Sequence, residues 1–345
     1  TLSTMFIIQA AVTLVTSALA IKVFKIQSAE LVTINMIVLS LSTALLTLNR
    51  ITLLNKAMKY IILTLTLATI SAILLSLGNI PDSFSQYSNP FEFGNELHIA
   101  ALVGLLGWMP APFDISVWHS IWSEDSYKAQ DKKPCLKSSL LDFRIGYIGT
   151  AILAICFLLL GAFFMYGSGE SFSPSGVKFS GQFIDLYSSA LGKTASYVIA
   201  IAAITTMFST TLTCLDAFPR SLRVSFELAS NKTFSEKQQK AVYLICLIIT
   251  SLGTALILGK FTGNMGTMIK IATTVAFTIA PVIAILNYLA IHHKDIPAEV
   301  KPKAINRYLA RFSIVILLLF SLYYIKTLIP EKSASEQVAL EEVRK

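Results

Sequence analysis

Nine long apolar segments restrict the fold of this chain more than any other feature of its 345 residues. Each approaches the length of about 20 residues that an α-helix needs to cross the hydrocarbon core of a bilayer. Only α-helices and closed β-barrels satisfy their backbone groups in lipid, and these runs are too long for barrel strands. The sequence therefore predicts an all-α, multi-pass membrane protein. The segments lie near residues 4–24, 30–48, 58–78, 97–122, 145–167, 193–216, 240–259, 266–291 and 311–329.

Composition supports a membrane location and argues against a nucleic-acid partner. Only 14% of the residues are charged, whereas soluble domains carry about a quarter. The net charge of +8 comes without any basic cluster interleaved with aromatic residues, so we predict the lipid bilayer, and no nucleic acid, as a partner. The four cysteines form no CxxC pair, which indicates neither a disulfide framework nor a zinc site.

The distribution of Lys and Arg predicts the orientation. Of the 28 basic residues, 18 fall in one set of alternate connectors, within 50–59, 128–144, 220–240 and 294–311. By the positive-inside rule these connectors are cytosolic, so the chain enters its first span from the cytosol. We expect one transmembrane domain over 1–329, in the cell membrane (the cytoplasmic membrane if the source is bacterial), and a solvated tail over 330–345. The outer segments 79–98 and 167–193 are rich in Gly, Ser, Pro and Phe, which favours loops with short amphipathic helices.

The segment "GWMPAPFDISVWHSIW" interrupts an apolar stretch with two prolines. Proline lacks an N–H, so Pro110 leaves the carbonyl of Leu106 without a donor, and Pro112 does the same for Trp108. Unpaired carbonyls in hydrocarbon are costly unless protein, water or an ion satisfies them. An unwound segment at mid-span indicates a transporter's binding site. The alternative is a proline kink without a ligand.

Two side chains beside these prolines suit a metal ion. Met109 offers a soft thioether, which fits Fe(II), Mn(II) or Cu(I) better than Mg²⁺ or Ca²⁺. Asp114 is an acid inside a span, and such residues are functional candidates because they are expensive there. Carbonyl, thioether and carboxylate together predict a metal site. A structural alternative is that Met109 only fills a gap in the packing.

Other polar residues have structural interpretations. Trp118, His119 and Trp122 are typical of an aromatic belt at the cytosolic interface. Asp216 fits either a solvated helix end or a local ion pair with Arg220.

Three threonines precede a proline deep in another apolar segment. Thr273, Thr274 and Thr278 lie before Pro281 on or near one helix face, and their hydroxyls could line a cavity or bond to their own backbone. His292, after this segment, is interpreted as a surface residue.

Enzymatic signatures are missing from the sequence. It contains no Gly-rich phosphate loop, no HExxH and no Ser-His-Asp arrangement that could meet at one depth. We therefore predict no catalytic residues, no enzyme activity and no cofactor, with a metal ion entering only as substrate.

The stretch "GLLGWMPAPFDISVWHS" resembles the sixth helix of the natural resistance-associated macrophage protein (NRAMP) family of divalent metal transporters. The family's Met-Pro-His-Asn motif matches Met109, Pro110, Ala111 and Pro112. The basic connector "NRITLLNKAMKY" also resembles the one between the family's fourth and fifth helices. On this mapping the chain holds nine of eleven helices, the third to the eleventh, and lacks the first two.

The resemblance implies a LeuT-type fold with inverted repeats and the uptake of metal ions, often coupled to protons. It implies that the thioether of Met109 and the carbonyl of Leu106 are ligands. The family's first-helix Asp-Pro-Gly-Asn motif, third-helix acids and ninth-helix arginines have no counterpart here, and its motif histidine is Ala111. Asp114 is new relative to the motif, so it is a candidate to replace a lost ligand or proton acceptor.

These features predict a secondary transporter of Mn²⁺ or Fe²⁺ with alternating access around residues 106–114, its proton coupling left open. A second hypothesis is a LeuT-type carrier of Mg²⁺ or a small organic solute, which would be indifferent to Met109→Ala. A third is a membrane scaffold or sensor that transports nothing and tolerates Pro110→Ala. No oligomeric state is predicted.

Overall fold

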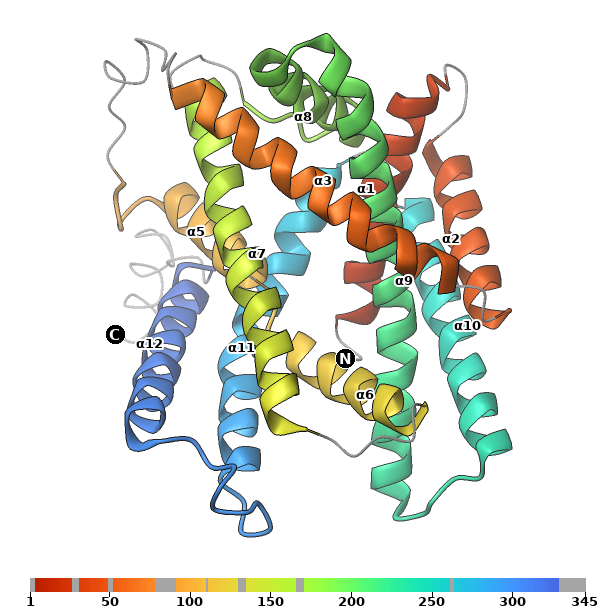
Figure 1. Ribbon diagram of the computed structural model, residues 1–345, viewed down its shortest axis with the longest axis vertical. Helices are drawn as coiled ribbons and strands as arrows, with labels where there is room; N and C mark the ends of the chain where they lie inside the picture. Colours follow the sequence, from red (N-terminus) through yellow and green to blue (C-terminus); the bar gives the residue numbers. More distant parts are fainter. Residues whose placement is uncertain are drawn as a thin grey trace, which may run out of the picture.

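The regular structure of the chain is α-helical throughout the residues that the computed structural model describes (Figure 1). These residues are 4–26, 31–48, 52–77, 91–109, 111–129, 135–165, 171–260 and 264–328; Pro110 and the predicted tail lie outside them. The all-α prediction is confirmed. The helices are α1 (Met5–Phe24), α2 (Leu31–Thr47), α3 (Thr52–Leu77), α5 (Glu96–Trp108), α6 (Ile115–Ala129), α7 (Leu136–Met165), α8 (Gly176–Leu191), α9 (Lys193–Ser230), α10 (Glu236–Lys260), α11 (Met265–Ile291) and α12 (Ala304–Leu328).

Most of these helices have the length and hydropathy of membrane spans. In the described part of the chain, seven are long and apolar enough to cross a bilayer, and α2 and α5 are shorter apolar helices. Every predicted segment contains a helix, and the segment over 97–122 contains two. The connectors from α9 to α10 and from α11 to α12, which carry many of the basic residues, lie at the same end of the molecule (Figure 1). The multi-pass prediction is therefore confirmed.

Two helices extend well beyond their predicted bounds. The apolar pattern placed the start of one span near 145 and the end of another near 216, whereas α7 begins at Leu136 and α9 ends at Ser230. The 38 residues of α9 span roughly 57 Å at about 1.5 Å per residue, nearly twice the hydrocarbon thickness of about 30 Å. Hydropathy detects only the lipid-covered part of a helix, so it missed these polar extensions.

An amphipathic helix, α8, lies across one end of the bundle (Figure 1), as predicted for part of 167–193. Tyr187 anchors it, because this side chain is 0% exposed and its hydroxyl hydrogen-bonds the Thr69 hydroxyl of α3 at 2.8 Å. Burial raises the pKa of Tyr187 to about 12, so the phenol stays neutral. The tyrosine therefore ties α8 to α3 without introducing a buried charge.

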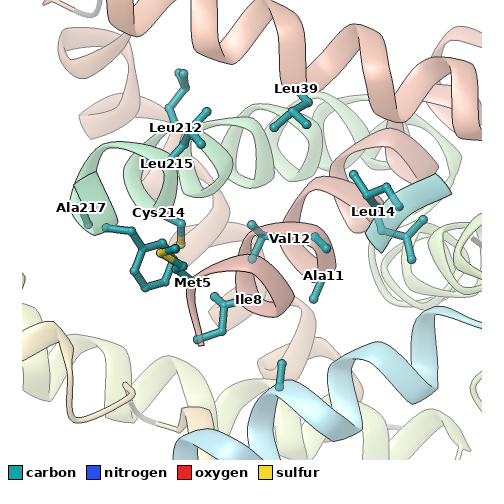
Figure 2. Packing of buried hydrophobic residues seen from close by; sticks show 14 of the residues in the cluster. Met5, Ile8, Ala11, Val12, Leu14, Leu39, Leu212, Cys214, Leu215 and Ala217 are labelled. Atoms are coloured by element: carbon teal, nitrogen blue, oxygen red, sulfur yellow. The ribbon is translucent and has the colours of Figure 1, made fainter. Parts of the chain in front are cut away.

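The core is built around α1, which packs against α9, α10, α8, α11 and α2. Figure 2 shows Met5, Ile8 and Leu14 of α1 near Leu39 of α2 and Leu215 of α9. The side chains of Leu14 and Leu215 are 0% exposed. Helix α1 is therefore enclosed by other helices on most sides, and two of these, α9 and α11, are the ones that α6 and α5 pack against.

Candidate functional site

The apolar stretch that contains the two prolines is interrupted in the structure. Helix α5 ends at Trp108 and α6 begins at Ile115. Met109 is in an extended conformation, with φ −116° and ψ 132°, and its N–H donates to the Leu105 carbonyl at 2.9 Å, which closes the last turn of α5. The two helices then continue as separate rods (Figure 1). We call residues 109–114 the helix break.

The carbonyl predicted to bind metal lies at the end of α5. Leu106 belongs to the last turn, and the final carbonyls of a helix have no donor within that helix. The Leu106 side chain is 41% exposed, and Met109 is half-buried. The structure therefore brings this carbonyl and the Met109 thioether to the same end of α5, and their role as ligands stays a prediction.

Asp114 stands immediately before α6. Its main-chain carbonyl accepts the N–H of Val117 at 3.0 Å, and its side chain is half-buried. A carboxylate at a helix N-terminus is favourable because it meets unpaired N–H groups and the positive end of the helix dipole. Asp114 therefore occupies a position where a carboxylate favours the start of α6, independently of any role in metal binding.

Helix α5 is held close to α11 by a glycine contact. Gly107 faces the main chain of Thr273, and a Cβ atom on this glycine would collide with the Thr273 carbonyl oxygen and lie 2.9 Å from the carbonyl carbon. One turn earlier, a Cβ on Gly104 would lie 3.7 Å from the Thr273 hydroxyl, which is an ordinary contact. Small residues permit such close backbone approach between membrane helices. The contact fixes the end of α5 that leads into the helix break.

The far half of α6 is held by a buried acid on α9. Asp216, 8% exposed, accepts hydrogen bonds from the Trp122 indole at 3.2 Å, the Arg220 guanidinium at 2.6 Å and the Tyr243 hydroxyl at 2.7 Å. Arg220 also bonds the Asp125 carboxylate of α6 at 2.8 Å. We call these five residues the Asp216 cluster. It joins α6, α9 and α10.

The cluster corrects two interpretations made from the sequence. Asp216 is not at a solvated helix end, since α9 continues for several turns and buries it, and the ion pair with Arg220 is confirmed. The aromatic-belt interpretation is wrong for both tryptophans. Trp118 is 5% exposed, and its ring packs edge-on against that of Phe218, with 5.1 Å between the ring centroids. The Trp122 indole N–H donates a hydrogen bond to Asp216. The spacing of four residues between Asp216 and Arg220 indicated their ion pair, but nothing local indicated Trp122, Asp125 or Tyr243 as further members.

The three threonines of α11 bond largely to nearby groups. The Thr273 hydroxyl donates to the Ile269 carbonyl at 2.9 Å, and that of Thr278 donates to the Thr274 carbonyl at 2.8 Å. The Thr274 hydroxyl lies 3.3 Å from the Tyr324 hydroxyl of α12. The backbone-bonding alternative therefore describes Thr273 and Thr278, and cavity lining stays a prediction for all three.

A neutral polar seam between α1 and α9 was not anticipated. The Gln9 amide donates to the Thr211 carbonyl at 3.2 Å, and the Thr16 and Thr211 hydroxyls lie 2.8 Å apart. Gln9 is 0% exposed, and its amide oxygen has no hydrogen-bond partner among the described residues. A glutamine in the middle of an apolar segment was the available sequence signal. The seam places hydrogen-bonding groups inside the bundle without ionisable ones.

Carboxylates and imidazoles do not gather into a metal centre in the described part of the chain. No group of three or more His, Cys, Asp or Glu residues there is placed to hold a metal ion. Within these residues, an ion at the helix break would depend on main-chain carbonyls, the Met109 thioether and the single Asp114 carboxylate. This is a mixed donor set of the kind that favours transition metals over Mg²⁺.

Comparison with known proteins agrees with these features. A family model described as "natural resistance-associated macrophage protein-like" matches residues 1–327. An uncharacterized protein of Pasteurella multocida (strain Pm70) is 35% identical over 261 residues, which is 74% of this chain and 58% of the relative. The chain thus spans less than two thirds of that relative's length. Because the family model covers nearly the whole chain, the chain belongs to the natural resistance-associated macrophage protein family, whose members are multi-pass membrane proteins with the LeuT-type fold.

Proposed function

We propose that the intact protein moves divalent transition-metal ions, Mn²⁺ or Fe²⁺, across the membrane by alternating access around residues 106–114. The family consists of divalent metal-ion transporters rather than enzymes. The observation that carries the proposal is the helix break itself, because it opens the backbone between Trp108 and Ile115 within an apolar stretch. Broken helices in transporters supply main-chain ligands near the middle of the membrane.

The chemistry at the helix break favours a soft ion. Met109 offers sulfur, the end of α5 offers carbonyl oxygens, and Asp114 adds a negative charge or accepts a proton. The thioether is the discriminating group, since a carrier of Mg²⁺ gains nothing from it. A scaffold or sensor would show no metal flux at all.

Replacing Met109 with leucine is expected to raise the Mn²⁺ concentration needed for half-maximal uptake by about tenfold, a scale typical of altered metal sites. Leucine keeps the side-chain volume and removes only the sulfur. The measurement is uptake of Mn²⁺ into proteoliposomes containing the intact protein. Met36→Leu, in the partly buried surroundings of α2, is the matched control and should transport normally. Equal uptake by wild type and Met109→Leu would contradict the sulfur ligand, and Mg²⁺ uptake unaffected by the change would favour the second hypothesis.

Testing Asp114 requires a variant that removes its negative charge but keeps a side chain that favours the start of α6. Asparagine caps a helix about as well as aspartate, so Asp114→Asn keeps the start of α6 and removes the carboxylate. We expect Asp114→Asn and Asp114→Ala to lose Mn²⁺ uptake to a similar extent, with only Asp114→Ala lowering the thermal unfolding midpoint. Normal uptake by Asp114→Asn would show that the residue serves α6 alone. Recording the internal pH of the same liposomes tests whether protons move with the metal.

A further inference from the structure

A cavity of about 380 Å³ lies between α11 and α12 and extends to the helix break. Its wall is largely apolar and includes Ala284, Ile314 and Leu317. Its polar lining includes Asn287, His292 and Arg307. We call this cavity the inner pocket. It lies at the end of the bundle that holds the connector from α11 to α12 (Figure 1), the end that the positive-inside rule assigns to the cytosol.

His292 belongs to the wall of the inner pocket. Its Nδ1 atom lies 2.7 Å from the Tyr288 carbonyl oxygen, and because a carbonyl can only accept, Nδ1 donates this hydrogen bond. Its Nε2 atom is buried and has no hydrogen-bond partner among the described residues, so this atom does not face the open part of the pocket. His292 therefore contributes to the wall without offering Nε2 to a ligand.

A basic side chain, Arg307, belongs to the wall of the inner pocket. Arg307 is exposed and belongs to none of the ion pairs found among the described residues. Lys301, Lys303 and Arg311 are close to it in the sequence, and Arg311 donates to the hydroxyl of Tyr288, another wall residue, at 2.6 Å. Beyond them, α12 turns apolar side chains outward, with Phe312 64% exposed. A cation beside an apolar wall at the inner membrane surface complements an anionic lipid.

We propose that the inner pocket binds an anionic glycerophospholipid, with phosphatidylglycerol as the fitting example. Its phosphate pairs with Arg307, and one acyl chain lies along the apolar wall. A path for metal cations is the poorer explanation of the same cavity, because Arg307 repels them and the wall offers few oxygen ligands. Phosphatidylcholine lacks the net negative charge that would pair with Arg307.

The bound lipid would lie next to the start of α6. The Asn287 amide donates to the Ser116 hydroxyl at 2.9 Å, and this hydroxyl donates to the Phe113 carbonyl in the helix break at 2.7 Å. Asn287 and Phe113 both line the inner pocket. Lipid binding would therefore stabilise the contact between α11 and the helix break whether or not the protein transports a metal.

The experiment measures lipid binding to the purified protein in a neutral detergent, without any transport assay. Thermal unfolding is followed with increasing dioctanoyl-phosphatidylglycerol, dioctanoyl-phosphatidylcholine or inorganic phosphate. We expect a rise in the unfolding midpoint with phosphatidylglycerol only. Arg307→Gln should lower the affinity for phosphatidylglycerol by about fivefold, which is the contribution typical of one basic residue at an anionic lipid surface. Ala284→Phe, which fills the pocket, should abolish the shift.

Control variants keep the outcomes separate. Lys237→Gln removes an exposed cation at the same end of the molecule, on α10, and should bind phosphatidylglycerol normally. Arg307 is exposed, so its substitution leaves folding intact even if Ala284→Phe does not. Protection by inorganic phosphate equal to that by the lipid would overturn the proposal in favour of a simple anion site. Equal protection by both lipids, unchanged in Arg307→Gln, would overturn it as well.

Discussion

Gly107→Ala is expected to prevent stable packing of α5 against α11. The added methyl group would collide with the main-chain carbonyl of Thr273, and a carbonyl within a helix cannot turn aside as a flexible side chain can. Overpacking of a well-packed contact costs about 1–3 kcal/mol, and the upper part of this range applies where backbone meets backbone. The contact also orients the end of α5 that leads to Met109, so Mn²⁺ uptake should fall together with stability.

Gly104→Ala is the matched control for this result. It lies on the same helix, one turn away, and its new methyl group would make only an ordinary 3.7 Å contact. Alanine also favours a helix over glycine by about 1 kcal/mol, so the variant should be as stable as the wild type or slightly more so. Unfolding midpoints and monodispersity in detergent compare the two. Equal behaviour of Gly104→Ala and Gly107→Ala would contradict the close approach of α5 to α11.

Asp216→Ala is expected to lower the free energy of unfolding by about 3 kcal/mol, the lower end of the range for breaking a buried ion pair. Removal of the carboxylate leaves Arg220 without its closest partner and takes the acceptor from Trp122 and Tyr243. Arg220 keeps its bond to Asp125, which limits the loss. The expected consequence is weaker attachment of α6 to α9 and α10, seen as a lower unfolding midpoint and easier proteolysis of α6.

An exposed pair on the same helix gives the control. His119 of α6 lies 3.6 Å from Asp142 of α7, whose side chain is 82% exposed. Exposed ion pairs contribute less than about 1 kcal/mol, so Asp142→Ala should leave stability nearly unchanged. If Asp142→Ala and Asp216→Ala were equally mild, the Asp216 cluster would not be what holds α6.

The fold was predictable where one physical requirement dominates. Lipid forces each long apolar segment into a helix, so the spans followed from hydropathy alone, and the paired prolines located the interruption between Trp108 and Ile115. The length of α9 was not predictable in this way. Its last turns are more polar, and a partner that holds them, Gln239, which Arg223 bonds at 2.7 Å, comes from another helix.

The helix break was predictable in its location, whereas the contacts that hold its two helices were not, and the donors proposed for the metal stay a prediction. Met109 and Asp114 stand out in the sequence because sulfur and carboxylate are unusual beside a broken helix. The role of Trp122 was misjudged because an indole near a membrane surface normally faces the headgroups. Its actual acceptor, Asp216, lies 94 residues away in the chain. Contacts over such separations depend on helix packing, which a local pattern does not contain.

The two halves of the interrupted helix have different main neighbours. Helix α5 packs mainly against α11 and also touches α12, whereas α6 packs against α9 and is held there by the Asp216 cluster. The hydrogen bond from Asn287 of α11 to Ser116 in the first turn of α6 links the two groups. A rotation of one group against the other would therefore break this bond first, and an ion held by Met109 and Asp114 would lie between the two moving groups.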